Sequence, residues 1–171
     1  MLKWKGIFGK VKCGMAKITL LCVGKLKEKH WSQACAEYEK RLHRYCELTT
    51  VESKESVTDD PVEEGKLLLK KISSRAYVIA CGVDGQSLDS VAWAGSLQKI
   101  IEEYGKEIVF VVGGSNGLSA DVKKRADLRI SFSEMTFPHQ LFRVVLLEQI
   151  YRAFTIMNNE KYHKGAKKRT S

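Results

Sequence analysis

The segment EIVFVV at residues 107–112 restricts the possible folds of this chain more than any other feature. After Glu107 it is entirely apolar and mostly β-branched, a pattern that predicts a strand buried on both faces. Such strands occur in parallel sheets that have helices packed on each side. The segment therefore predicts that helices connect the strands of this chain and cover both faces of one sheet.

Helical and strand-like patterns alternate along the rest of the chain, about five of each, as in an α/β domain with a mainly parallel sheet. The expected strands are 17–23, 47–51, 76–81, 107–112 and 128–133, and the turn GVDGQ is expected to close the third. The expected helices begin near Trp31, Pro61, Leu88, Ser119 (as an N-cap) and Pro138.

The net charge of +9 is concentrated at the two ends of the chain. Residues 1–14 contribute +4 and residues 164–171 another +4, which leaves +1 for the body between them. Basic ends favour a polyanion such as RNA, although a solubilising role fits the charge equally well. We interpret 1–14 as a basic extension ahead of a second possible start at Met15, 15–164 as one domain, and 165–171 as a basic tail.

The five cysteines are scattered, without a CxxC pair or a Cys/His cluster. Neither a disulfide framework nor a metal site is therefore expected. No apolar run approaches the roughly 18 residues of a membrane span. These features predict a reduced, cytoplasmic protein that has no metal and does not cross a membrane.

Unusual residues follow three of the expected strands, and ligands of α/β sheets bind at the carboxyl ends of strands. Cys81 and Gly82 follow the third strand, Gly113 and Gly114 the fourth, and the stretch SFSEMTFPHQ begins within the fifth. The glycine pair allows close approach of backbone to a ligand. It matches neither a Walker loop nor a dinucleotide fingerprint, so a plain turn is at least as consistent with the sequence.

His139 and Arg143 lie four residues apart and so on one face of the last expected helix. Near a ligand, His139 could act as a base or a hydrogen-bonding group, but a capping or packing histidine is the commoner case. Glu148 and Arg152 read as a structural ion pair. Tyr162, His163 and Lys164 form a polar end that could contact RNA or simply fray.

Several motifs together resemble the RlmH family, small SPOUT-class methyltransferases that modify N3 of a pseudouridine in 23S ribosomal RNA. The resemblance covers Met15 to Lys164, and it rests on KITLLCVGKLKEKHW, AEYEKRL, FVVGGSNGLS, SFSEMTFPHQL, RVVLLEQIYRAF and the terminal YHK. It implies a SPOUT-type α/β sheet with a C-terminal trefoil knot, a homodimer, and S-adenosylmethionine bound in the knot.

Carried over by position, the resemblance places cofactor contacts at Cys81, Gly113, Phe132, Ser133, Glu134, Met135, Thr136 and Phe137. The family usually has Leu at position 81 followed by an acidic residue, where this chain has Cys81 and Gly82. Backbone contacts would survive that difference, whereas side-chain packing on the adenosine would change.

The resemblance also suggests roles for the polar residues. The imide proton of pseudouridine N3 must leave, so we hypothesise that His139 acts as the base or orients the ring. Arg143 would hold a phosphate or carbonyl, and Tyr162, His163 and Lys164 would contact RNA. The expected substrate is the assembled 70S ribosome. The alternatives are a non-catalytic ribosome-binding protein on a SPOUT fold, and a nucleotide-binding oxidoreductase or NTPase.

Overall fold

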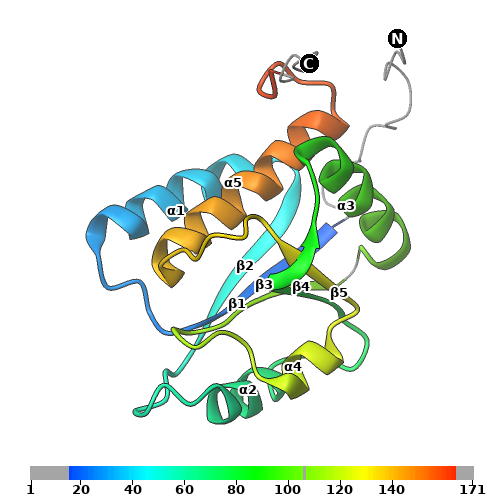
Figure 1. The fold of residues 1–171 in the computed structure, drawn as a ribbon. Helices are drawn as coiled ribbons and strands as arrows, with labels where there is room; N and C mark the ends of the chain where they lie inside the picture. Colours follow the sequence, from blue (N-terminus) through cyan, green and yellow to red (C-terminus); the bar gives the residue numbers. More distant parts are fainter. Residues whose placement is uncertain (1–15, 106, 165–171) are drawn as a thin grey trace, which may run out of the picture.

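A computed structural model describes residues 16–105 and 107–164 (Figure 1). Ten elements alternate within these described residues, as the sequence patterns predict: β1(Ala16–Val23), α1(Lys29–Leu42), β2(Cys46–Ser53), α2(Pro61–Leu69), β3(Tyr77–Ser87), α3(Ser90–Tyr104), β4(Ile108–Val112), α4(Ala120–Arg125), β5(Leu128–Ser131) and α5(His139–Met157). The predicted basic extension 1–14, the possible start at Met15 and the tail 165–171 lie outside the described residues.

The five strands form one parallel sheet in the order β2-β1-β4-β3-β5. β4 is the central strand, and every residue from Ile108 to Val112 is buried. The prediction of a central strand covered on both faces is therefore confirmed. The uninterrupted apolar run is required because this strand meets helices on each side.

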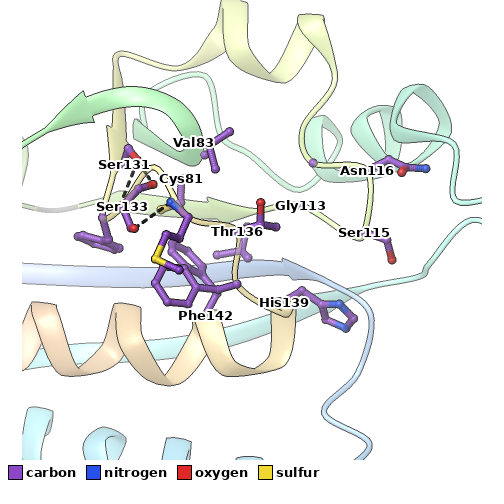
Figure 2. A pocket seen from close by; sticks show the side chains of 17 residues that line it. Cys81, Val83, Gly113, Ser115, Asn116, Ser131, Ser133, Thr136, His139 and Phe142 are labelled. Carbon is purple, nitrogen blue, oxygen red and sulfur yellow. Dashed lines mark hydrogen bonds between the residues drawn. The ribbon is translucent and has the colours of Figure 1, made fainter.

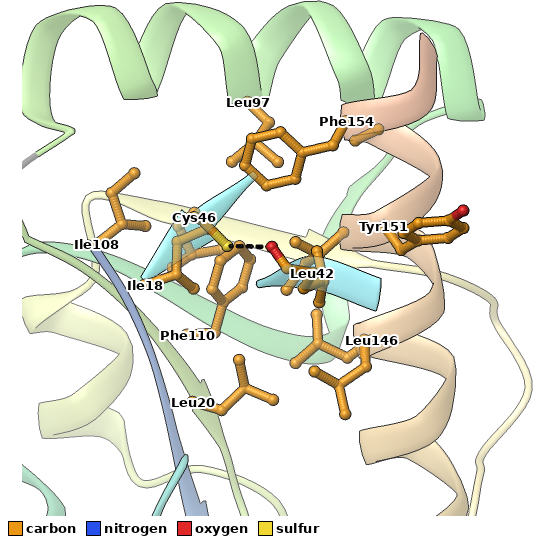
Figure 3. Packing of buried hydrophobic residues seen from close by; sticks show 14 of the residues in the cluster. Ile18, Leu20, Leu42, Cys46, Leu97, Ile108, Phe110, Leu146, Tyr151 and Phe154 are labelled. Atoms are coloured by element: carbon orange, nitrogen blue, oxygen red, sulfur yellow. Dashed lines mark hydrogen bonds between the residues drawn. The ribbon is translucent and has the colours of Figure 1, made fainter. Parts of the chain in front are cut away.

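The helices form two layers, one on each face of the sheet (Figure 1). Ile108, Phe110 and Val112 point into the larger core under α1, α3 and α5, whereas Val109 and Val111 point into the smaller core under α2 and α4. Figure 3 shows Phe110, Leu97 and Phe154 among the side chains of the larger core. This is the alternation that a pleated strand produces.

β3 is longer than the sequence patterns predict. We expected the strand to end at Cys81 with a turn, but it resumes pairing with β5 and continues to Ser87. Both Cys81 and Gln86 pair with Ile130, so residues 82–85 form a bulge. Gly85 allows it, because a Cβ there would lie 2.3 Å from the backbone carbon of Ile130.

The segment between β5 and α5 is irregular over residues 132–138. β5 ends at Ser131, two residues earlier than predicted, and α5 begins at His139 with Pro138 as its N-cap. Ser119 caps α4 as predicted, its hydroxyl accepting a hydrogen bond from the Val122 amide at 3.3 Å.

The architecture confirms the expected class, an α/β fold with a parallel sheet and helices on both faces. The trefoil knot stays a prediction. None of the helices in the described part of the chain combines the length and the apolar character that a membrane span requires.

Candidate functional site

A pocket of about 330 Å³ opens at the carboxyl ends of β4 and β5 and beside the bulge of β3, where the sequence places the unusual residues (Figure 2). Residues 81–83 and 112–117 line it, together with most of the segment 131–137. His139 and Phe142, from the first turn of α5, complete the lining. Its position is the usual one for a ligand site in an open α/β sheet.

The loop after β4 must have glycine at position 113. A Cβ at Gly113 would lie 2.5 Å from the carbonyl carbon and oxygen of Gly117, so only glycine permits this close turn. Gly117 itself has φ of 77° and donates its amide to the Gly114 carbonyl at 3.1 Å. The result is a narrow loop whose backbone borders the pocket without side chains in the way.

This glycine loop is held from behind by residues that sequence reasoning did not single out. Asn116 donates from its side-chain amide to the Asp59 carbonyl at 2.8 Å. The buried Glu64 carboxylate accepts the Ser56 amide at 3.1 Å and occupies the space where a Cβ of Gly114 would lie, 2.8 Å from Oε2. These contacts join the glycine loop to the segment before α2.

The segment 131–137 forms the opposite wall and bonds mainly to itself. Ser131 donates from its hydroxyl to the Ser133 carbonyl at 2.8 Å, and the Met135 amide donates to the Ser133 hydroxyl at 2.9 Å (Figure 2). The Phe132 and Phe137 rings lie 5.6 and 6.3 Å from Phe142, which anchors the wall on α5.

Seven of the eight predicted cofactor-contacting residues line the pocket: Cys81, Gly113, Phe132, Ser133, Met135, Thr136 and Phe137. Glu134 is the exception. It is exposed and absent from the lining, because the turn directs it toward solvent. The prediction of a Glu134 contact therefore receives no support from the geometry.

The pocket offers aromatic and aliphatic surface with few charges. Among the described residues that line it, only Cys81 and His139 have ionisable side chains. Burial raises the pKa of the Cys81 thiol far above its ordinary value, so it remains a neutral wall of the pocket. A flat, largely apolar ligand with a few backbone hydrogen bonds suits such a site. No group of three metal-binding side chains occurs in the described part of the chain.

A protein-family model described as "Predicted SPOUT methyltransferase" matches residues 16–163, most of the chain. The chain belongs to this family. The match includes all five strands and all three segments that line the pocket.

Solved structures share the fold at low sequence identity. A probable methylase family protein from Haemophilus influenzae matches with a TM-score of 0.51 and 14% identity, over 91% of this chain and 73% of its own. The tRNA (m1G37) methyltransferase from Aquifex aeolicus matches with a TM-score of 0.50 and 12% identity, over 90% and 77%.

A third structure is the ribosomal RNA small subunit methyltransferase E from Neisseria gonorrhoeae, bound to S-adenosyl methionine. It matches with a TM-score of 0.46 and 10% identity over 79% of this chain. The SPOUT chain described here spans 65% of the length of that protein.

His139 stands at the pocket mouth of this SPOUT family member. Its side chain is 27% exposed, and Nε2 faces the Glu55 carboxylate at 3.9 Å. Neither ring nitrogen has a hydrogen-bond partner within the ranges that the structure describes. The imidazole therefore has ring nitrogens at the pocket mouth that a ligand could contact.

Arg143 is not placed to hold a phosphate or carbonyl of a substrate, the role that the family resemblance suggested for it. Its guanidinium is buried and donates to the Val23 and Gly24 carbonyls at 2.7 Å each, and to Glu52 Oε1 at 2.9 Å. One helical turn beyond His139, it points to the end of β1 and cannot hold a phosphate. Its role in this SPOUT domain is to fix α5 on the sheet.

Tyr162 and His163 lie beside the C-terminal half of α5, among residues read from sequence as a simple ion pair. Tyr162 donates to Glu148 Oε1 at 3.0 Å, and Arg152 contacts the same oxygen and lies 3.3 Å from His163 Nδ1. Arg152 is thirteen residues beyond His139, about 20 Å along a helix. Within one SPOUT chain, this cluster is therefore remote from the pocket, and Lys164 is also absent from the pocket lining.

Proposed function

We propose that this protein is an S-adenosylmethionine-dependent RNA methyltransferase of the RlmH type. Its substrate would be N3 of a pseudouridine in 23S ribosomal RNA, on assembled 70S particles. The observation that carries the proposal is the pocket at the carboxyl ends of β4 and β5 and the bulge of β3, with the glycine loop on one wall and aromatic side chains on the other, in a SPOUT family member.

The residues present fit the cofactor. The glycine loop closes tightly at Gly113, where a Cβ would meet the Gly117 backbone, and the pocket volume of about 330 Å³ falls within the range of small-molecule sites. Phe132, Phe137 and Phe142 would pack on the adenosine, and backbone groups of residues 113–117 and 131–137 would hydrogen-bond to it. When bound, S-adenosylmethionine supplies a methyl group on a positively charged sulfur.

The chain itself has to position the target nitrogen and remove its proton. The N3 proton of the uracil-type ring would pass to His139, and the electron pair left on nitrogen would form the bond to the methyl carbon. The electron pair of the broken carbon–sulfur bond would stay on sulfur and neutralise it. No acid has to assist that departure, so alignment of the reacting atoms supplies most of the catalysis.

A homodimer would complete the site. The cluster of Tyr162 and His163 with Arg152 lies too far along α5 to reach the pocket of its own chain. A second copy could bring it beside the pocket, where Tyr162, His163 and Lys164 would contact the RNA. An RNA substrate inside the cell also agrees with the predicted cytoplasmic location.

The test uses labelled S-adenosylmethionine with 70S particles and with protein-free 23S RNA, followed by mapping of the methyl group. We expect label at a single pseudouridine of the 70S particles and much less on free RNA. Cofactor binding by calorimetry without label on either substrate would contradict the proposal and favour a non-catalytic ribosome-binding protein. Tighter binding of NAD or a nucleoside triphosphate would favour the oxidoreductase or NTPase alternative.

A further inference from the structure

Positive charge in the described part of the chain is concentrated in two segments. Residues 65–76 contain four basic and no acidic residues, and residues 120–130 contain four basic and two acidic residues. The described residues together carry a net charge of only +1. The other eight net positive charges of the chain belong to basic residues outside the described ranges: Lys3, Lys5, Lys10, Lys12, Lys106, Lys167, Lys168 and Arg169. The rest of the described surface is therefore net negative.

The fold brings these two segments side by side on the face of the sheet opposite α5 (Figure 1). Arg125, at the end of α4, donates to the Ala76 carbonyl at 2.8 Å and to the Ser73 carbonyl at 3.3 Å. Gly65 of α2 packs closely on Ser119, where a Cβ would lie 2.1 Å from the hydroxyl oxygen. We call the result the α2–α4 basic surface; it consists of Lys66, Lys70, Lys71, Arg75, Lys123, Lys124, Arg125 and Arg129.

Five of these side chains are exposed and lack an ion-pair partner among the described residues: Lys66, Lys70, Lys71, Arg75 and Lys124. Lys123 and Arg129 share Asp84, at 3.2 and 3.6 Å, and Arg125 pairs with Asp127. Elsewhere in the described part of the chain, basic residues have acidic neighbours in sequence, as Lys40 and Lys99 do, or form smaller groups, as Lys25, Lys27 and Lys29 do around Glu28. The α2–α4 basic surface brings together five exposed basic side chains without an ion-pair partner in the described ranges, in two adjacent segments.

Helix dipoles explain only part of this arrangement. Basic residues near a helix C-terminus stabilise it, and Lys70 and Lys124 lie at such ends. Lys66 also lies in the last turn of α2, whereas Arg75 and Arg129 lie outside any helix. The positions of Arg75 and Arg129 therefore need another explanation, and binding of a polyanionic partner provides one.

We propose that the α2–α4 basic surface binds the phosphodiester backbone of structured RNA, at a distance from the nucleotide that enters the pocket. The inference rests on the proposed function and names the second contact with the same substrate. Separate ammonium and guanidinium groups suit backbone phosphates, which position a protein without reading the base sequence. Such a contact explains how a small domain recognises a large particle rather than a single nucleotide.

The test compares two matched double variants of the full chain. Lys71→Gln with Lys124→Gln neutralises the α2–α4 basic surface, and Lys40→Gln with Lys99→Gln removes the same charge from α1 and α3. Affinities for 70S particles and for protein-free 23S RNA are measured over a salt series. We expect the slope of log K against log salt to fall by about 2 for the first pair and to stay unchanged for the second.

Two outcomes would overturn the proposal. Equal slopes for both double variants would show that the α2–α4 basic surface does not contact RNA phosphates. Weaker binding of the first pair to 70S particles, but unchanged binding to protein-free RNA, would assign the surface to a ribosomal protein instead. Methyl transfer by the unaltered chain is assayed in parallel, so loss of the proposed activity and loss of the proposed surface are separate results.

Discussion

The imidazole of His139 faces the carboxylate of Glu55, with Nε2 3.9 Å from Oε1. Lys27 holds the other oxygen of that carboxylate at 3.0 Å, and Gly24 leaves room for it, since a Cβ there would lie 2.3 Å from Oε1. Glu55 is thus fixed between the loop after β1 and the start of α5. The carboxylate is therefore held beside the imidazole of His139 at the pocket mouth.

Substitution of His139 tests its role as the base. If the imidazole accepts the N3 proton, His139→Ala lowers the single-turnover rate on 70S particles by about 10²–10⁴-fold. Binding of S-adenosylmethionine, measured by calorimetry, changes little. His43→Ala, at an exposed histidine outside the pocket lining, is the matched control and should behave like the unaltered chain. A normal single-turnover rate for His139→Ala would exclude the proton transfer.

Removal of the charge on Glu55 tests the orientation of His139. Glu55→Gln retains the size of the side chain but weakens its contacts with Lys27 and the imidazole. We expect kcat to fall by roughly tenfold while the KM for the cofactor is unchanged, because the change affects the position of a catalytic group. Glu47→Gln removes an exposed partner of Lys17 and serves as the comparison. Equal kcat values for the two variants would show that Glu55 does not position His139.

The close turn of the glycine loop predicts that a side chain at Gly113 weakens ligand binding. Gly113→Ala places a methyl group against the Gly117 backbone, and overpacking of this kind costs about 1–3 kcal/mol. We expect the affinity for S-adenosylmethionine to fall by roughly tenfold or more. Gly82→Ala is the control within the same pocket, because its added methyl group would meet only the flexible Asp84 side chain, at 3.0 Å. Equal affinities of both variants for S-adenosylmethionine would show that the close turn at Gly113 is not required for binding.

Arg143 is predicted to act on stability. Arg143→Ala leaves the Val23 and Gly24 carbonyls and the Glu52 carboxylate without their donor, and disruption of a buried pair typically costs about 3–5 kcal/mol. Urea denaturation should show this loss in the free energy of unfolding. Arg41→Ala, which removes a surface pair with Glu37, should have little effect. A stable Arg143→Ala protein with weakened RNA binding would instead support a role for Arg143 in holding a phosphate or carbonyl of the substrate.

The buried thiols predict a loss of stability at high pH. Burial raises the pKa of Cys22 from 9.0 to about 12, opposed in part by Arg143, and the pKa of Cys35 to about 11. In the unfolded chain these thiols lose their protons near their ordinary pKa, whereas the native state retains them. The stabilisation is complete below pH 9 and is lost as pH rises toward 11.

Denaturation at several pH values checks this expectation. The Cys22→Ala variant should show a flatter decline of the unfolding free energy above pH 9 than the unaltered chain, because one of the titrating groups is gone. Identical slopes would mean that the Cys22 thiol titrates alike in both states.

The sequence was most informative where one local pattern determines an element. The apolar run of β4 predicted both a strand and its central place, and Ser119 predicted the start of α4. β3 was predicted too short, because Gly82 and Gly85 indicate a turn. Only the pairing of Gln86 with Ile130 shows that the strand continues.

The side chains around the site were harder to predict because their partners are distant in sequence. Helical spacing correctly places Arg143 near His139, but its burial depends on carbonyls of Val23 and Gly24, 120 and 119 residues earlier. Glu55 carries no motif, and its contact with His139 joins residues 84 positions apart in the sequence.

Two neighbouring parts of the pocket lining, the start of α5 and segment 131–137, are attached to the protein in different ways. The side that carries His139 is tied to the first two strands by Arg143 and Gln140, so it cannot shift without breaking several bonds. The side chains of Ser131 and Ser133, in contrast, hydrogen-bond only within segment 131–137. A ligand can therefore displace the hydroxyl contacts of Ser131 and Ser133 without disturbing the sheet, whereas the start of α5, with His139, is held in place by the sheet.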